Sequence, residues 1–151
     1  MNPSDDYFLD QAIELAREAE RSGEVPAGSI VVLGGRIIGR GRNSPITLND
    51  PTAHAEILAL RRAAEAAGNY RLEGATLYST LEPCVMCAGA LVAARVARLV
   101  FGVRDLRFGG VRSKFRLADT DILNHRVEVT EGVRGAECAE LMRRFFESRR
   151  G

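Results

Sequence analysis

Two short motifs, thirty residues apart, place potential metal ligands at the beginnings of two predicted helices. The first, "PTAHAEILAL", carries one of only two histidines in the chain, His54, with Glu56 two positions later. The second, "PCVMCAGALVAA", carries Cys84 and Cys87. Each begins with a proline, which suits the first turn of a helix because its missing N–H is not needed there. If both motifs serve one site, the fold must bring two helix N-termini together.

Cys84 and Cys87 are three positions apart, so in the first turn of a helix both sulfurs lie on one side and can bind one ion. Thiols at this end face the positive pole of the helix dipole, which lowers their pKa. Two thiolates and an imidazole favour zinc, one ion per chain, and three protein ligands leave one tetrahedral position for water. His54 is the natural third ligand. His125 is the alternative, but it has no acidic neighbour at a comparable spacing.

Glu56 is the natural general base of such a site. Side chains two positions apart do not share a helix face. His54 and Glu56 can nevertheless both lean over the N-terminal end of the helix, one toward the metal and the other toward its bound water. A catalytic site lowers the pKa of zinc-bound water to about 7, and Glu56 would take that proton and pass it to the substrate. Two helix dipoles, each worth about +0.5 charge, would help offset the charge of about −1 that two thiolates and a hydroxide leave on zinc.

A structural or redox role for the cysteine pair is the alternative. A structural zinc site normally has four protein ligands, and only His125 or Cys138 could supply the fourth. Cys138 lies on an apolar stripe of the last predicted helix, which favours a place in the core. The combination of H-A-E and P-C-V-M-C matches the signature of zinc-dependent deaminases. A catalytic site is therefore favoured.

The composition is that of an ordinary globular protein. Its 151 residues fit a single domain, 1–151, with 46% hydrophobic and 27% charged residues. No apolar run is long enough to span a membrane, and the acidic, polar beginning does not resemble a signal peptide. Three cysteines, two of them in "PCVMC", favour a metal site in a reducing cytoplasm over a set of disulfides.

Hydrophobic periodicity predicts alternating helices and strands. Loops are expected at "GEVPAG" and "RNSPITLND", and residues 104–123 are expected to be irregular. Helices between strands predict a three-layer α/β/α sandwich on a mixed sheet. The predicted helices cover residues 4–21, 51–67, 84–94 and 136–149, and the predicted strands are "SIVVL", "RIIGRG", "ATLYSTL", "RLVFGV" and "HRVEVT".

The chain resembles the bacterial tRNA-specific adenosine deaminases, a branch of the cytidine deaminase-like superfamily. The resemblance is carried by "GEVPAG", "NDPTAHAEILAL", "YRLEGATLYSTLEPCVMCAGA", "VFGVRD", "NHRVEVTEG" and "ECAELMRRFF". It implies a five-stranded mixed sheet with flanking helices, and a homodimer with active sites near the subunit interface. It also implies that His54, Cys84 and Cys87 bind zinc while Glu56 shuttles protons.

The same resemblance implies a reaction and a partner. The enzyme would be a hydrolase that converts adenosine to inosine at the wobble position of a tRNA anticodon stem-loop, with an arginine tRNA as the substrate. Zinc hydroxide would add to C6 of the purine, Glu56 would protonate N1, and ammonia would leave. The backbone N–H of Ala55, at a helix start, could help to orient the base or the developing charge.

The resemblance also implies substrate contacts at five positions. Asn43, Asp105 and Asn124 match positions near the target nucleoside, although asparagine and aspartate in loops also bond their own backbone as turn residues. Phe146 and Arg149 match positions that contact the anticodon loop. A helical wheel does not decide whether Phe145 or Phe146 faces the RNA.

Charge is the remaining observation that bears on a nucleic-acid partner. The net charge is only +1, but basic residues gather in residues 104–116 and in the tail from residue 143 onward. A solvated surface is the alternative for both groups. Residues 104–110 read "RDLRFGG", whereas many members of the family have a lysine soon after the aspartate. Arg107 would take over the phosphate contact of that lysine, with a planar guanidinium that donates two hydrogen bonds in place of a point charge. Phe108 is either a stacking platform or a loop anchor.

Two other functions fit parts of the sequence. A deaminase of a free nucleobase or nucleoside, such as guanine or cytosine, would use the same zinc chemistry. A non-catalytic RNA-binding or structural zinc module would not need Glu56, and the presence of this glutamate argues against it.

Overall fold

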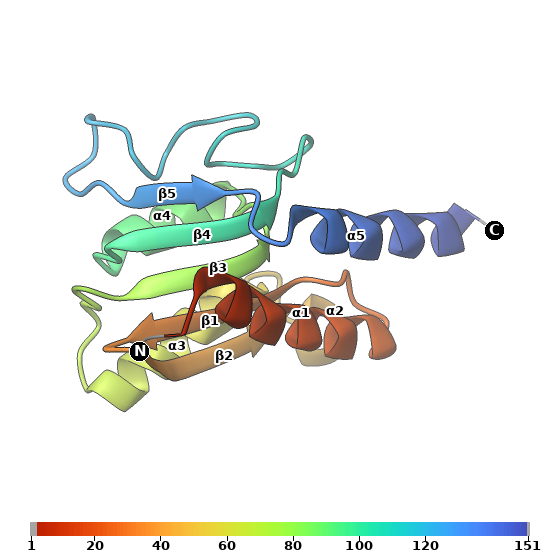
Figure 1. Ribbon diagram of the computed structural model, residues 1–151, viewed down its shortest axis with the longest axis horizontal. Helices are drawn as coiled ribbons and strands as arrows, with labels where there is room; N and C mark the ends of the chain where they lie inside the picture. Colours follow the sequence, from red (N-terminus) through yellow and green to blue (C-terminus); the bar gives the residue numbers. More distant parts are fainter. Residues whose placement is uncertain (1–2, 151) are drawn as a thin grey trace.

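A computed structural model describes residues 3–150, and its centre is one mixed sheet of five strands (Figure 1). The strand order is β2-β1-β3-β4-β5. β1 pairs antiparallel with β2 and β3, while β4 runs parallel to both β3 and β5. The strands are β1 (Gly28–Leu33), β2 (Arg36–Arg42), β3 (Thr76–Leu81), β4 (Arg98–Val103) and β5 (Glu128–Glu131).

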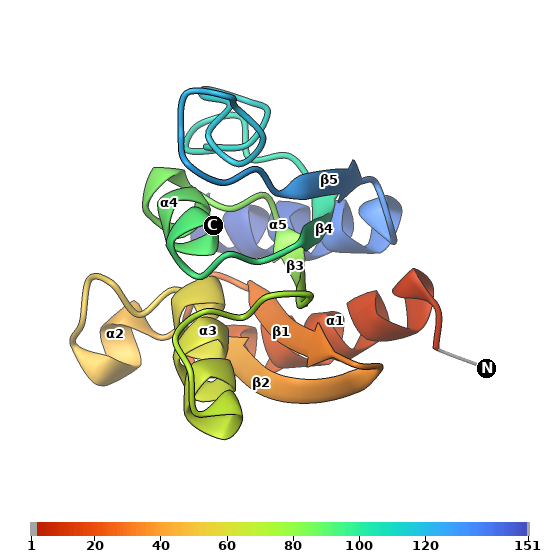
Figure 2. The same ribbon diagram turned by 90° about the vertical axis from the view of Figure 1, so that its left-hand side faces the viewer.

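Helices cover both faces of this sheet. α1 and α5 lie on one face and α3 and α4 on the other, so the predicted three-layer α/β/α sandwich is confirmed (Figure 2). None of the described helices is long and apolar enough to cross a membrane. The helices are α1 (Asp5–Arg21), α2 (Pro45–Leu48), α3 (Ala55–Ala67), α4 (Val85–Ala93) and α5 (Gly135–Arg150).

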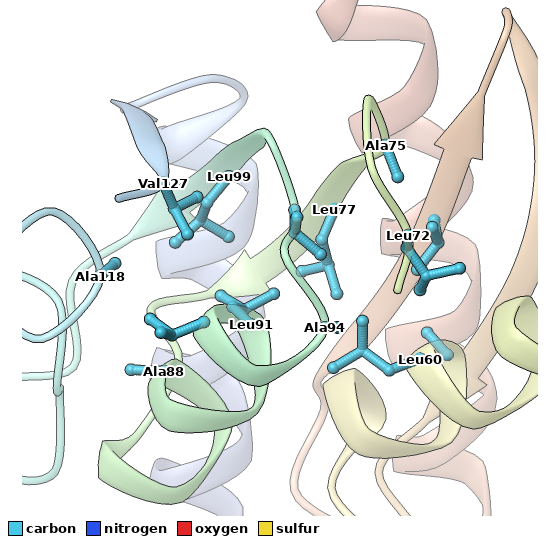
Figure 3. Close-up of a cluster of buried hydrophobic side chains, with 14 of the residues drawn as sticks. Leu60, Leu72, Ala75, Leu77, Ala88, Leu91, Ala94, Leu99, Ala118 and Val127 are labelled. Carbon is cyan, nitrogen blue, oxygen red and sulfur yellow. The ribbon is translucent and has the colours of Figure 1, made fainter. Parts of the chain in front are cut away.

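Each face of the sheet has its own apolar core. On the α3–α4 face, Leu60, Leu77, Leu91 and Leu99 are among the buried side chains that fill the space between helices and strands (Figure 3). On the other face, residues of α1 and α5 pack against the buried strand residues that point to that face, such as Ile30 and Val100. Successive strand residues point to opposite faces, so the central strands, with both faces covered, are hydrophobic nearly throughout.

α3 packs directly on β2 because that strand has glycines where the helix crosses it. A Cβ atom at Gly41 would lie 2.2 Å from the carbonyl oxygen of Ala55, and one at Gly39 would lie 2.3 Å from that of Ala59. No side chain fits in these places. The strand therefore sets the position of the first turn of α3, which carries Glu56.

The fold brings several chain segments to one edge of the sheet. The carboxyl ends of β2, β3 and β4 meet there with the amino end of β1, because β1 runs antiparallel to both β2 and β3. The segments that follow β2 and β3 continue into α3 and α4. Both predicted helix starts thus arrive at the same edge.

Most predicted elements are present with ends within one or two residues, but α3 begins at Ala55 rather than near Pro51, and β5 begins at Glu128 rather than at His125. Residues 104–127 contain no strand or helix, as expected over 104–123. The main difference is α2, a short helix where the sequence predicts only a loop. The buried carboxylate of Glu24 accepts hydrogen bonds from the backbone N–H groups of Ile46 and Thr47. These bonds satisfy the otherwise unpaired N–H groups of a helix start.

Candidate metal and active site

His54, Cys84 and Cys87 form a compact group at the carboxyl edge of the sheet. His54 is the N-cap residue of α3, and Cys84 is the N-cap residue of α4. The Nδ1 atom of His54 lies 3.5 Å from each of the two sulfurs. All three ligand atoms lie within 4.8 Å of one another. The structure therefore brings together the two motifs that the sequence separates by thirty residues.

The dimensions of this group fit a tetrahedral zinc ion. Zn–S bonds of about 2.3 Å and a Zn–N bond of about 2.0 Å at the tetrahedral angle place sulfur and nitrogen about 3.5 Å apart. The observed separation is 3.5 Å. Within the described residues, no further histidine, cysteine or carboxylate belongs to the group. Three ligands of this kind are typical of a catalytic rather than a structural zinc site.

Neither alternative ligand is near this group. The Nε2 atom of His125 lies 2.7 Å from the carbonyl oxygen of Val96, at hydrogen-bond distance. Cys138 is buried in the core on the α1–α5 face, as the apolar stripe predicts. The structure thus separates both residues from the cysteine pair.

The electrostatics of this group favour a cation. A hydrogen bond from Cys87, together with one from His54, lowers the pKa of Cys84 to about 4. The hydrogen bond to Cys84 and burial both raise the pKa of the Cys87 thiol. The Cys84 thiolate in turn raises the pKa of His54. A metal ion would displace these protons, since only thiolates and neutral imidazole are ligands.

Glu56 stands beside the ligands in the first turn of α3. Its side chain is almost fully buried, at 6% exposure. Burial raises the pKa of Glu56 to about 7, and the nearby Cys84 thiolate acts in the same direction. A carboxyl group with such a pKa can both accept and donate a proton near neutral pH. This is the property expected of the predicted proton carrier.

A cavity of about 450 Å³ opens onto these side chains. It combines an apolar wall with a small number of polar groups, as is typical of small-ligand sites. Two predicted substrate residues, Asn43 and Asp105, lie in its walls. The residues that line it are Val25, Ala27, Asn43, His54, Glu56, Leu81, Glu82, Cys84, Asp105 and Phe108.

Asp105 combines the two roles considered from the sequence. Its Oδ1 atom accepts hydrogen bonds from the backbone N–H groups of Arg107 and Phe108, which makes it a turn residue. Its side chain also lines the cavity. Asn43 is half-buried, and its backbone N–H donates to the carbonyl oxygen of Ala27. Ala55 is buried at the start of α3 and does not line the cavity, although its backbone N–H belongs to the first helical turn.

Asn124 does not line the cavity of its own chain, and its expected contact with the target nucleoside stays a prediction. It is exposed, and its Oδ1 atom accepts a hydrogen bond from Arg95, just beyond the C-terminal end of α4. Cys84 is at the opposite end of this nine-residue helix, roughly 14 Å away at 1.5 Å per residue. The reason is that the irregular segment after β4 leads to Asn124 at that far end.

A second cavity, of about 420 Å³, adjoins the first, and the two share Val25, Leu81, Asp105 and Phe108. Phe146 lines this second cavity, whereas Phe145 is buried. The guanidinium carbon of Arg107 lies 4.9 Å from the ring centre of Phe146 and 5.4 Å from that of Phe108.

Arg149 lies at the same end of the molecule but outside both cavities. Its guanidinium covers the ring of Phe145 at 4.6 Å from the centroid and donates a hydrogen bond to the carbonyl oxygen of Gly23.

The predicted basic groups are partly neutralised. Arg104 pairs with Glu131, and both Arg112 and Arg116 pair with Asp119. Within the described residues, Arg107 has no carboxylate within 4.0 Å. The free positive charge beside the cavities is therefore smaller than the sequence suggests.

Sequence reasoning missed two buried carboxylates, that of Glu24 and that of Glu82, which lines the cavity. Each binds backbone N–H groups of a distant segment. The sequences "GEVP" and "TLEP" around them do not show whether the glutamate is buried and bound to backbone N–H groups or exposed to solvent.

The sheet and the His-Cys-Cys-Glu site together define a deaminase of the cytidine deaminase-like class. The family model described as MafB19-like deaminase matches residues 3–150. The tRNA-specific adenosine deaminase of Haemophilus influenzae is 49% identical over 97% of this chain and 85% of its own. The chain belongs to the family of tRNA-specific adenosine deaminases.

Two solved structures show the same architecture. A structure from studies of A-to-I editing by tRNA:A34 deaminases superimposes with a TM-score of 0.86, at 45% identity over 89% of this chain and 98% of that one. A guanine deaminase from Bacillus subtilis superimposes with a TM-score of 0.66, at 40% identity over 68% of this chain and 66% of that one.

Proposed function

We propose that this protein is a zinc-dependent hydrolase that converts adenosine to inosine at the wobble position of a tRNA anticodon, with His54, Cys84 and Cys87 as zinc ligands and Glu56 as the proton carrier. The observation that carries this proposal is the joint placement of a zinc-sized ligand group and a buried carboxyl group in one cavity. The relatives named tRNA-specific adenosine deaminase supply the substrate class.

The residues of this chain divide the reaction between them. A zinc ion would supply a water molecule acidic enough to act as a nucleophile at neutral pH. Glu56 takes a proton from the attacking water and delivers it to N1 of the adenine as C6 becomes tetrahedral. Glu56 then carries the second proton to the amino group, which leaves as ammonia. Its burial, which raises its pKa to about 7, suits it to both steps.

The walls of the cavity suit a nucleoside turned out of an RNA loop. A volume of about 450 Å³ lies within the range of sites that enclose small ligands. Asn43 offers amide groups to the nucleoside, and Asp105 keeps its Oδ2 atom, which has no hydrogen bond within the described residues, for a ribose 2′-OH. Contact with a 2′-OH distinguishes RNA from DNA.

The second cavity suits the nucleotides next to the target. Phe108 and Phe146 present ring faces on which bases stack. Arg107 offers a planar fork to a phosphate. Arg149 lies further along the same end of α5, where an anticodon loop would continue. We take an arginine tRNA to be the partner, as the resemblance implies.

We also infer that the active molecule is a cytoplasmic homodimer formed through the α3–α4 face. This face carries an apolar hollow of about 320 Å³ bordered by Ile57, Leu60 and Tyr70. The exposed side chains of Val85 and Met86 stand on α4 between the two cysteines. Contiguous exposed apolar surface of this kind marks a protein contact. A second copy bound here would approach both active sites.

The test is a substrate comparison with metal analysis of the same sample. The protein is incubated with an arginine tRNA that has adenosine at the wobble position, and separately with free adenosine, guanine and cytosine. We expect inosine only in the tRNA, and one zinc ion per chain. Ammonia released only from a free base would overturn the tRNA proposal in favour of a nucleobase deaminase. Preparations that are active after complete zinc removal would contradict the metal assignment.

A further inference from the structure

Glu82 is a buried carboxylate that the proposed reaction does not use. It follows β3 and comes two residues before Cys84, and its side chain accepts five hydrogen bonds from one loop, residues 105–113. Its Oε1 atom binds the backbone N–H of Asp105 at 3.0 Å and the hydroxyl of Ser113. Its Oε2 atom binds the N–H groups of Val111, Arg112 and Ser113 at 2.7–3.0 Å.

The 105–113 loop is closed tightly around this carboxylate. A Cβ atom at Gly109 would lie 2.4 Å from the carboxylate atoms of Glu82, so only glycine fits. The N–H of Gly110 donates to the carbonyl oxygen of Pro83 at 2.8 Å, and Gly109 forms a β-bridge with Cys84. The loop therefore rests directly on the segment that carries the first cysteine ligand.

The same loop forms the outer wall of the candidate active site. Asp105 and Phe108 line both cavities, and Arg107 lies between the rings of Phe108 and Phe146. All five donors to Glu82 are backbone N–H or hydroxyl groups, so the carboxylate serves no basic side chain. Hydrogen bonds to a charged acceptor are about twice as strong as neutral ones.

We propose that Glu82 is a positioning residue for substrate recognition: it fixes the RNA-contacting 105–113 loop at a set distance from the Cys84 metal-ligand segment. The inference rests on the proposed function, because it assigns the loop to RNA. Without the carboxylate, several buried N–H groups lose their acceptor, and the wall formed by Asp105 and Phe108 moves relative to Glu56. Recognition of the polynucleotide then weakens while the ligand group stays intact.

The test compares Glu82→Gln and Ser113→Ala with the wild type and with Glu73→Gln, an exposed glutamate that lines neither cavity. For each protein, zinc content, thermal unfolding and steady-state kinetics on the anticodon stem-loop are measured. We expect one zinc ion per chain throughout, a KM about tenfold higher in Glu82→Gln and about threefold higher in Ser113→Ala, with kcat within about twofold of the wild type. Glu73→Gln should match the wild type.

The outcomes separate this inference from the proposed function. An unchanged KM in the zinc-loaded variants, or a loss confined to kcat, overturns the positioning role while the wild-type activity stands. If Glu82→Gln fails to fold or to bind zinc, Ser113→Ala decides alone, because it removes only one hydroxyl donor. A wild type that does not act on the stem-loop overturns the proposed function, and the inference with it.

Discussion

Glu56 and the three proposed metal ligands, His54, Cys84 and Cys87, lie together although they come from two separate motifs. His54 and Cys84 each occupy the N-cap position of a helix, and neither side chain caps its own helix. Both side chains are instead directed at one another and at Cys87, with Glu56 beside them. Spacing in the sequence predicts this group because its chemistry is local to two short motifs.

Replacing Glu56 tests its role as the proton carrier. Glu56→Ala should lower kcat by about 10³-fold, within the range that a positioned acid–base group contributes. Zinc content should remain at one ion per chain, because Glu56 is not one of the three ligands. Stopped assays with tRNA and metal analysis of the same preparation check both points. A variant with wild-type turnover would remove Glu56 from the mechanism.

Substitutions of Cys87 and Cys138 should have opposite effects on zinc binding. Cys87→Ala removes one of the clustered ligand atoms and should abolish stoichiometric zinc binding. Cys138→Ala should retain one zinc ion per chain, and we expect it to lower the free energy of unfolding by about 1 kcal/mol, because the buried thiol behaves as a small hydrophobic group. Zinc loss in Cys138→Ala would contradict the separation of this residue from the site.

The sequence does not predict Glu24 and Glu82 as anchors, and the reason is physical. The partners of Glu82 lie 23 to 31 positions away, and those of Glu24 lie 22 and 23 positions away. Such pairings depend on which strands end at the same edge of the sheet. Asn124 illustrates the same limit: the matching motif is local, but the path of the chain before it decides that the side chain lies near the C-terminal end of α4.

At the scale of elements, α1 is attached to the sheet by a polar contact as well as by its apolar face. Arg98 of β4 donates two hydrogen bonds to the carboxylate of Asp5, in the first turn of α1, and Tyr78 of β3 donates a third. The hydrogen bonds from Arg98, with a contribution from Tyr78, lower the pKa of Asp5. The helix start is thus fixed over two neighbouring strands.

This contact makes stability depend on pH in a defined direction. A carboxyl group whose pKa is depressed by folding stabilises the folded state above its unfolded pKa of about 3.9, and this contribution is lost as the pH falls through the folded value. Asp5→Asn should therefore lower the free energy of unfolding by about 1–2 kcal/mol near pH 7. The difference from the wild type should shrink as the pH falls below the unfolded pKa and should disappear once the pH is below the lowered pKa of Asp5.

Denaturant titrations between pH 3 and pH 7 measure this effect. Asp6→Asn is the matched control, because Asp6 is exposed in the same helical turn and makes none of these hydrogen bonds. A difference for Asp5→Asn that stays constant over the whole pH range would show that the loss arises from packing rather than from the ionised carboxylate.

Most helix and strand positions were predictable to within a residue or two because hydrophobic periodicity and proline or glycine boundaries are local signals, although α3 and β5 both begin three or four residues later than predicted. α2 was not, because four residues carry no periodicity and the helix depends on the distant Glu24 carboxylate. The order of the strands in the sheet could not be predicted from the strand sequences alone. The parallel pairing of β3 with β4, for example, depends on the crossover through α4 that connects them.

At the scale of the whole molecule, the proposed homodimer interface can be tested without touching the site. Tyr70 is 67% exposed at the border of the apolar hollow on the α3–α4 face. Tyr70→Glu should shift the protein from dimer to monomer, because a charge buried in an interface is strongly unfavourable. The resulting monomer should remain folded.

Sedimentation velocity over a range of concentrations distinguishes the two states. Tyr7→Glu is the control, since Tyr7 is similarly exposed on α1, on the opposite face of the sheet. A wild type that sediments as a monomer at all concentrations would contradict the interface. Equal dissociation in both variants would contradict its location.

The two proposed zinc ligands at helix starts, His54 and Cys84, have a consequence for the amount of the protein in a cell. Helices normally begin at a side chain that accepts their free N–H groups, and substitution of such a residue lowers stability by about 1 kcal/mol. α3 and α4 lack that support, so we expect ion binding to hold both ends in place and to add to the folding free energy. A cell starved of zinc would then degrade newly made copies, and the shortage would reduce how much of the protein exists as well as how fast each copy works.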